Sequence, residues 1–134
     1  TYGDDFLNSI TLQLNKVIGA DYTFIARLDP AQRMSHTIAL VVNGQLVDNI
    51  AYSLIGTPCS NVADDSVCCY PTNVCNLFPD DQLLADMSVQ AYLGTPLHNS
   101  KGEVIGIIVA LYQHQLAESE FVHLISDIFR SDIG

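Results

Sequence analysis

The sequence contains no tryptophan and only five lysine and arginine residues, against fifteen aspartate and glutamate residues. The formal net charge is therefore −10. Nucleic acids and anionic membranes are bound through a basic face of a protein, so this balance argues against both partners. The acidic residues are spread along the chain, which indicates a solvated acidic surface. We expect no nucleic-acid binding and no direct membrane contact.

Long apolar segments are missing as well. No run of about eighteen apolar residues occurs, so we predict no transmembrane helix. The first residues lack the basic and apolar regions of a secretory signal. The chain starts at Thr1 and ends abruptly at Gly134, and we interpret it as a domain taken from a longer cytoplasmic protein. The four cysteines are then expected to be reduced thiols.

The remaining composition is that of one folded domain. The chain has 134 residues, of which 49% are hydrophobic and 15% charged. This length suits a single domain over residues 1–134 and leaves no room for a second core. About two thirds of the unfolded surface can be buried at this size, so the fold needs no disulfide.

Hydrophobic periodicity predicts a helix followed by a strand and a hairpin. Apolar residues at helical spacing predict a helix over 5–19, with Gly19 as its stop. The first strand alternates apolar and polar residues, which is typical of a half-exposed strand. Asn43-Gly44 lies between two apolar runs and is a strong hairpin signal. The strands predicted in this half are residues 22–28, 38–42 and 46–52.

Residues 54–90 differ from the rest and are called the excursion below. They hold all four cysteines and three of the five prolines, but neither lysine nor arginine. Thr57 and Pro58 predict the start of one short helix, and Asp81 lies at the start of a second. A long segment with little regular structure inside a small domain is usually functional.

The second half of the chain predicts another hairpin and a helix. The strand over 104–112 is almost entirely apolar and should be central in the sheet, and Gly106 indicates close packing within it. It pairs with a strand over 92–98, and a helix with Ser119 as its cap follows. This order predicts an α+β fold with an antiparallel sheet. The terminal helices can cover one face and the excursion the other, which leaves a ligand cavity between sheet and excursion.

Several stretches in this order resemble the GAF domain family, from about Phe6 to Phe129. They resemble most the GAF modules that precede GGDEF diguanylate cyclase, histidine kinase or PAS domains in bacterial signalling proteins. The stretches are residues 19–22, 54–59, 70–74, 78–81, 92–97 and 100–102, together with Gly106.

The resemblance implies a sheet of strand order 3-2-1-6-5, with a possible short edge strand from the excursion. It implies a pocket between the sheet and the excursion, and homodimers through the terminal helices. The implied activity is sensing, in which a bound ligand or partner is reported to an output domain in the same chain. The domain itself is then not an enzyme.

Seven residues of the excursion and its neighbouring strands are candidates for the ligand pocket. Tyrosine offers a ring for stacking and a hydroxyl for hydrogen bonding. A thiol in the first turn of a helix is activated by the helix dipole. Ordinary core packing is the alternative interpretation for both residue types. The candidates are Tyr52, Thr57, Cys59, Cys68, Tyr70, Cys75 and Tyr92.

The same region disfavours an anionic ligand. A cyclic nucleotide would meet no lysine or arginine in the excursion, and Asp80 and Asp81 would repel it. We therefore expect a neutral or weakly polar small molecule, or none.

Bilin, haem and zinc are each disfavoured as cofactors. The cysteine spacing C-x8-C-C-x5-C lacks the C-x2-C pair of structural zinc sites. Bilin-binding GAF domains typically attach the chromophore at a cysteine followed by histidine, whereas Tyr70 follows Cys69 and Asn76 follows Cys75. The four histidines lie near expected strand ends or on a helix, where a solvated or hydrogen-bonded ring is common.

Two alternatives to a sensor remain open. One branch of the GAF family consists of free methionine-R-sulfoxide reductases, whose pocket cysteines pass through a sulfenic acid. The other alternative is a ligand-free dimerisation spacer, which a small pocket filled by side chains would favour.

Overall fold

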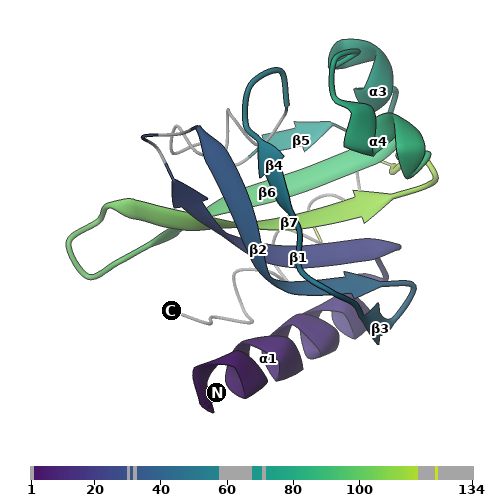
Figure 1. Ribbon diagram of the computed structural model, residues 1–134. Coiled ribbons are helices and arrows are strands. Elements are labelled where there is room, and N and C mark those ends of the chain that lie inside the picture. The colour runs from purple at the N-terminus through teal and green to yellow at the C-terminus, as the bar shows by residue number, and fades with distance from the viewer. Residues whose placement is uncertain are drawn as a thin grey trace.

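Figure 1 shows the computed structural model, which describes residues 2–29, 31, 33–57, 68–70, 72–117 and 123. An antiparallel sheet dominates the described part, and helices lie on its two sides. The elements are α1 (Tyr2–Ile18), β1 (Tyr22–Asp29), β2 (Met34–Val42), β3 (Gln45–Leu46), β4 (Ala51–Ser53), β5 (Cys68–Tyr70), α3 (Val74–Leu77), α4 (Gln82–Asp86), β6 (Ala91–His98) and β7 (Val104–Tyr112).

The strand order β3-β2-β1-β7-β6-β5 confirms the predicted topology. β4 also pairs with β2, so the predicted third strand is split into β3 and β4. The split occurs where the Thr37 hydroxyl donates to Asn49 Oδ1 at 2.9 Å and accepts from the Ile50 amide at 2.8 Å. β5 is the short edge strand of the excursion, and it pairs with β6. β7 lies between β1 and β6, in the central position expected from its apolar sequence.

The predicted hairpin turn is confirmed at Asn43-Gly44. Both residues have positive φ, 51° and 83° respectively. Asparagine and glycine tolerate this left-handed region better than other residues, and a tight turn between twisted antiparallel strands requires it. The sequence therefore specifies this connection locally.

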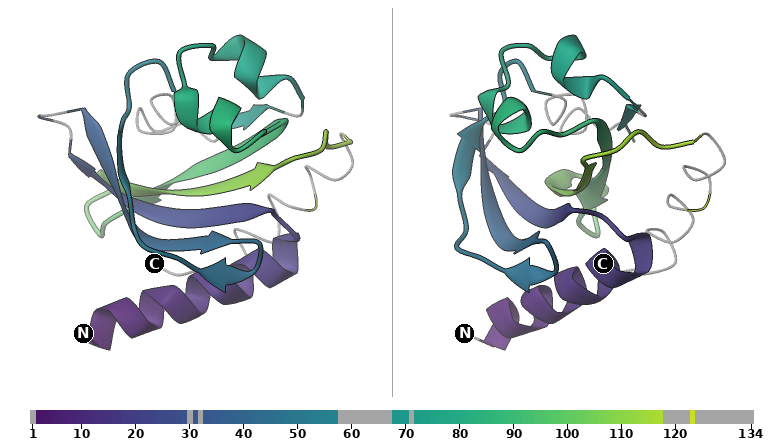
Figure 2. Two further views of the ribbon diagram at one scale, coloured as in Figure 1. Left: turned by 45° about the vertical axis from the view of Figure 1, so that its right-hand side comes forward. Right: turned by 90° about the vertical axis from the view of Figure 1, so that its right-hand side faces the viewer.

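The two faces of the sheet are covered by different segments (Figure 2). α1 lies across one face, where the Asn15 amide donates to the Thr23 hydroxyl at 2.8 Å. The hydroxyl of Tyr112 donates to the Ile18 carbonyl at 2.8 Å and fixes the end of the helix. α3 and α4 lie on the other face. No helix in the part of the chain that the structure describes is long and apolar enough to cross a membrane.

One prediction about β1 is wrong. The polar-apolar alternation suggested a half-exposed strand, but Thr23 and Ile25 on its second face are only 0% and 1% exposed. This face is buried because α1 packs on it, and Asn15 satisfies the hydroxyl of Thr23. The polar side chain of Thr23 therefore marks a buried hydrogen bond and not a solvent-exposed face.

The helix predictions have mixed outcomes. α1 ends next to Gly19, as predicted, and α4 follows its N-cap Asp81, the last residue of the predicted helix start at 78–81. α3 was not predicted, because its four residues are too few for a periodic pattern. The helix predicted to follow Thr57 and the C-terminal helix capped by Ser119 lie outside the described residues.

Gly106 confirms the expected close approach between strands. A Cβ built at this position would lie 2.6 Å from the carbonyl oxygen of Ala26 on β1. That oxygen belongs to the backbone of a central strand, so it cannot move aside without disturbing the sheet.

We therefore expect Gly106→Ala to lower the free energy of unfolding by about 1–3 kcal/mol, the usual cost of overpacking. Ile105→Ala is the control, because the neighbouring side chain is 51% exposed and should matter less. Urea denaturation of both variants measures the difference. Equal stability of Gly106→Ala and the original protein would contradict the close contact.

Candidate ligand-binding site

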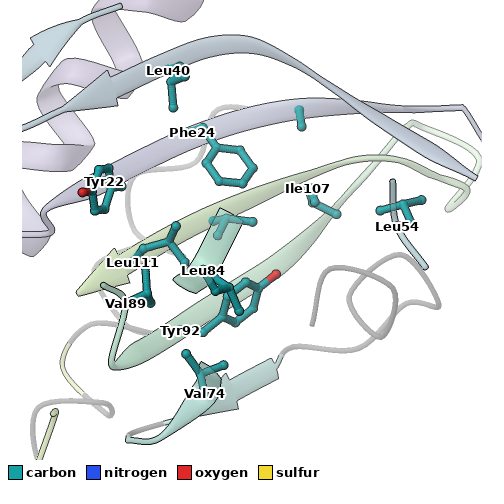
Figure 3. Packing of buried hydrophobic residues seen from close by; sticks show 12 residues of the cluster. Tyr22, Phe24, Leu40, Leu54, Val74, Leu84, Val89, Tyr92, Ile107 and Leu111 are labelled. Atoms are coloured by element: carbon teal, nitrogen blue, oxygen red, sulfur yellow. The ribbon is translucent and has the colours of Figure 1, made fainter. Parts of the chain in front are cut away.

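A small cavity lies between the sheet and α4, where the fold predicts a pocket. Its volume is about 30 Å³, which holds roughly two water molecules. The walls are mainly apolar and aromatic, and Figure 3 shows several of these side chains converging from the strands and from α4. The lining residues are Tyr22, Phe24, Leu40, Ile50, Tyr52, Asp81, Leu83, Leu84, Met87, Tyr92, Val109 and Leu111.

The floor of the cavity follows directly from strand alternation. Every second residue of a strand points to the same face. Tyr22 pairs with Leu111 and Phe24 with Val109, so two neighbouring strands form one continuous apolar surface. Leu40 of β2 extends this surface, because it pairs with Phe24 on the other side.

The roof is the segment 73–89, called the lid below, which contains α3 and α4. Leu84 is buried against the sheet, and the Asp81 carboxylate caps α4 by accepting from the Leu84 amide at 3.3 Å. Ring contacts tie the lid to the edge of the sheet. Tyr70 meets Phe78 at a centroid distance of 5.2 Å and Tyr92 at 5.9 Å, both edge-on.

Three hydrogen bonds form a network at the C-terminal end of the lid, and we call this network the latch. The Gln113 side-chain amide donates to the Met87 carbonyl at 2.9 Å and to the Tyr22 hydroxyl at 3.2 Å. The same hydroxyl donates to the Met87 carbonyl at 3.3 Å. The Gln113 backbone amide is itself held by Asp21 Oδ2 at 2.7 Å. Gln113 follows β7 directly, so the latch joins the lid, the cavity wall and the end of the central strand.

Asp81 alone carries a charge among the cavity-lining residues that the structure describes. Burial raises the pKa of this carboxyl, while hydrogen bonds from the Leu84 and Leu83 amides act in the opposite direction. The capping role explains its place at the start of α4. It also makes Asp81 an acidic member of a mainly apolar and aromatic cavity lining.

Ser35 supplies an unsatisfied hydroxyl on the same face of the sheet. Its Oγ is fully buried and has no hydrogen-bond partner, the one such side-chain atom in the described part of the chain. Ser35 pairs with Leu28 on one side and with Tyr52 on the other. Tyr52 lines the cavity, so Ser35 lies one side chain away from it.

The structure brings together only some of the predicted site residues. Tyr52 and Tyr92 line the cavity, and Tyr70 packs behind Tyr92. Thr57 is buried but does not line the cavity, and its hydroxyl donates to the Leu54 carbonyl at 2.8 Å.

The predicted cysteines are not gathered at the cavity. Cys75 lies outside its lining, and Cys68 belongs to β5, where its backbone pairs with Gly94. Cys59 and the side chain of Cys68 lie outside the described residues. Within those residues, no group of three or more histidine, cysteine or acidic side chains could hold a metal ion.

Cys75 has the environment of a structural thiol. It is half-buried in α3 and donates to the Val89 carbonyl at 3.0 Å. Burial, together with the negative charge of Asp81, raises the pKa of the thiol, although the bond to Val89 acts against this. Because the thiolate is the nucleophile, this cysteine is poorly suited to redox chemistry.

Sequence reasoning missed most of the cavity wall. Tyr22, Phe24 and Leu84 were recognised as apolar positions of their elements but not as pocket residues. Strand alternation could have identified the first two, since both share the face that the excursion covers. Nothing in the sequence marks Gln113, because its partners are distant along the chain.

Comparisons with known proteins agree on one family. The model of the GAF domain matches residues 3–130. No significant match was found among curated proteins.

Solved structures with the same fold include GAF domains of sensors. The A. aeolicus nlh2 GAF domain in an inactive state has a TM-score of 0.70 and 15% identity, covering 96% of this chain and 80% of that one. The phycocyanobilin-bound GAF domain of a cyanobacterial phytochrome has a TM-score of 0.65 and 16% identity, with coverage of 96% and 80%. At these identities the similarity concerns the fold alone.

The latch predicts a local effect of Gln113→Ala. Losing the amide removes its hydrogen bond to Met87, the one that ties it directly to the lid, which is worth about 0.5–1.5 kcal/mol. We expect amide hydrogen exchange at residues 84–89 to accelerate roughly three- to tenfold, with little change in β7. Gln115→Ala, at an exposed glutamine two residues further, is the control. Unchanged exchange in the lid would show that the latch does not hold it.

The environment of Cys75 predicts that its thiol is alkylated slowly in the folded protein. Its raised pKa leaves less thiolate at about pH 8.5 than an ordinary cysteine has. We expect iodoacetamide to label Cys75 several-fold more slowly in the folded protein than in urea, as read by peptide mass spectrometry. Asp81→Asn removes the negative charge beside the thiol and should partly restore the rate. Equal rates in the folded and unfolded protein would contradict a protected thiol.

Proposed function

Since this chain belongs to the GAF domain family, which commonly binds small molecules in sensor proteins, we propose that it is a regulatory ligand-binding sensor. Its ligand is a small, largely apolar molecule held between the sheet and the lid. The domain acts as a cytoplasmic homodimer and controls an output domain in the same chain, such as a diguanylate cyclase or a histidine kinase. It performs no catalysis itself.

The cavity between sheet and lid carries this proposal. It lies on the face that the excursion covers, and most of its walls are apolar or aromatic. Pockets of this composition, with a few polar groups at their edge, are typical of small-molecule sites. The lid closes it with short helices and exposed hydrogen bonds, which a ligand could displace at modest cost.

Opening of the lid is the expected signal. A cavity of about 30 Å³ admits only water, so a larger ligand must push α4 outward. A ligand shifts such an equilibrium only through its different affinities for the closed and open states. Movement of Met87 would release Gln113, and through it the chain that leaves β7.

The proposed dimer would use the outer side of α1. Phe6 and Val17 are 59% and 53% exposed there, and they lie about three helical turns apart on one side of the helix. Large apolar side chains in water are typical of an interaction surface. The predicted C-terminal helix would complete the interface.

A ligand-free spacer is the second candidate, because the cavity is small and side chains fill most of the space beneath the lid. A bilin is not proposed: the cavity is far smaller than such a molecule, and no cysteine is followed by histidine. A thiol enzyme gains no support from Cys75, whose thiol is protected.

Native mass spectrometry of freshly purified protein tests the sensor directly. We expect a dimer carrying an extra small-molecule mass that is lost on denaturation. Val109→Leu adds one methylene to the cavity floor and should reduce the occupied fraction several-fold. Val41→Leu makes the same change at a buried position outside the cavity lining and is the matched control.

Two results of this experiment would contradict the proposed sensor. A dimer without extra mass, and with no binding in a small-molecule screen, would favour the spacer. Extra mass retained on denaturation would indicate a covalent adduct and would contradict a reversible apolar ligand.

A further inference from the structure

The cavity combines one carboxylate with several aromatic rings, and this combination suits a particular ligand. Four of its lining residues are aromatic, namely Tyr22, Phe24, Tyr52 and Tyr92. Asp81, the N-cap residue of α4, lines the cavity together with them. We propose that the pocket binds a small amine, with its apolar body on the sheet and its protonated amino group donating to the Asp81 carboxylate. This inference rests on the proposed function.

The carboxylate has acceptor capacity left for a ligand. An ionised carboxylate offers about four lone-pair positions. The amides of Leu84 and Leu83 account for the interactions that cap α4, and the first of these bonds is long, at 3.3 Å. An ammonium group donates up to three hydrogen bonds and accepts none, so it complements the remaining positions.

The charges around the pocket favour a cation over an anion. The excursion contains no lysine or arginine, so none of its residues supplies a permanent positive charge to neutralise Asp81. The net charge of −10 acts in the same direction. Burial makes the ionised form of Asp81 costly, and a bound cation would relieve this cost because opposite charges favour ionisation.

The aromatic side chains of the cavity also favour a cationic ligand. A cation within about 6 Å of a ring is attracted by the ring's negative face. Phe24 and Tyr52 meet edge-on at a centroid distance of 6.0 Å, and they line the cavity together with Asp81. A carboxylate and aromatic rings at one site form a better environment for an ammonium group than for a neutral molecule of the same shape.

The position of Asp81 also connects the ligand to the lid. Asp81 belongs to the lid, whereas Phe24 and Val109 belong to the sheet. A small amine that contacts both would bridge the two parts and select one lid position. Binding of the amino group to Asp81 would then directly change the position of the lid.

A series of three probes with a common ring tests the proposal. Benzylamine, benzyl alcohol and benzoate are titrated into the full 134-residue chain at pH 7. Binding is followed by the NMR shifts of the Val109 and Leu111 methyl groups. We expect benzylamine to bind at least tenfold more tightly than benzyl alcohol, and benzoate to bind least.

Asp81→Asn is the decisive variant, since asparagine caps a helix as well as aspartate does. It should remove the preference for benzylamine over benzyl alcohol. Asp86→Asn, at an exposed carboxylate of the same helix that bonds to Gln82, should keep the preference. This control separates the pocket from general attraction to an acidic surface.

Each outcome separates the two proposals. Equal affinities of benzylamine and benzyl alcohol for the original protein would overturn the amine ligand but leave an apolar ligand pocket intact. An unchanged preference in Asp81→Asn would place the recognition of the amino group elsewhere and would also overturn it. If no probe shifts the two methyl groups, the ligand pocket itself is contradicted. The first comparison needs no variant, so it decides even if Asp81→Asn fails to fold.

Discussion

Both faces of the two central strands are buried along most of their length, and the rest of the structure depends on this constraint. Consecutive residues of β7 from Ile107 to Tyr112 are all buried, and β1 is buried on both sides over its first five residues. Apolar area of this extent is stable only out of water. The chain must therefore supply one cover for each face, and α1 and the lid are these covers.

The two covers are attached in different ways. α1 is a long helix, anchored by the buried side chains of Asn15 and Tyr112. The lid consists of two short helices, which have little stability of their own, and its last turn is held by the exposed Gln113. The part of a protein with the weakest local contacts opens first. A ligand would therefore displace the lid before it disturbed α1, and under the proposed function the small cavity would be the closed form of the site.

The proposed preference for a cationic ligand follows from the distribution of charge. In the sequence alone, the absence of lysine and arginine from the excursion argues only against an anionic ligand. It becomes specific once the lid places Asp81 at an apolar cavity without a permanent cation from its own segment. Burial, together with the same carboxylate, raises the pKa of Cys75 and so disfavours its thiolate. One acidic residue thus weakens the case for thiol chemistry and strengthens the case for a cationic ligand.

Local patterns in the sequence determined the elements of the sheet and their order, because strand alternation, the Asn43-Gly44 turn and the apolar run over 104–112 act between near neighbours. They also located the pocket side and two of its tyrosines. Tertiary structure alone decided that Thr23 is buried, because α1 covers it from a distant part of the chain. It alone joined Gln113 to Met87 and placed Asp81, rather than the cysteines, at the cavity. These contacts depend on how segments far apart in the sequence lie side by side. The hydrophobic periodicity of the sequence carries no information about that arrangement.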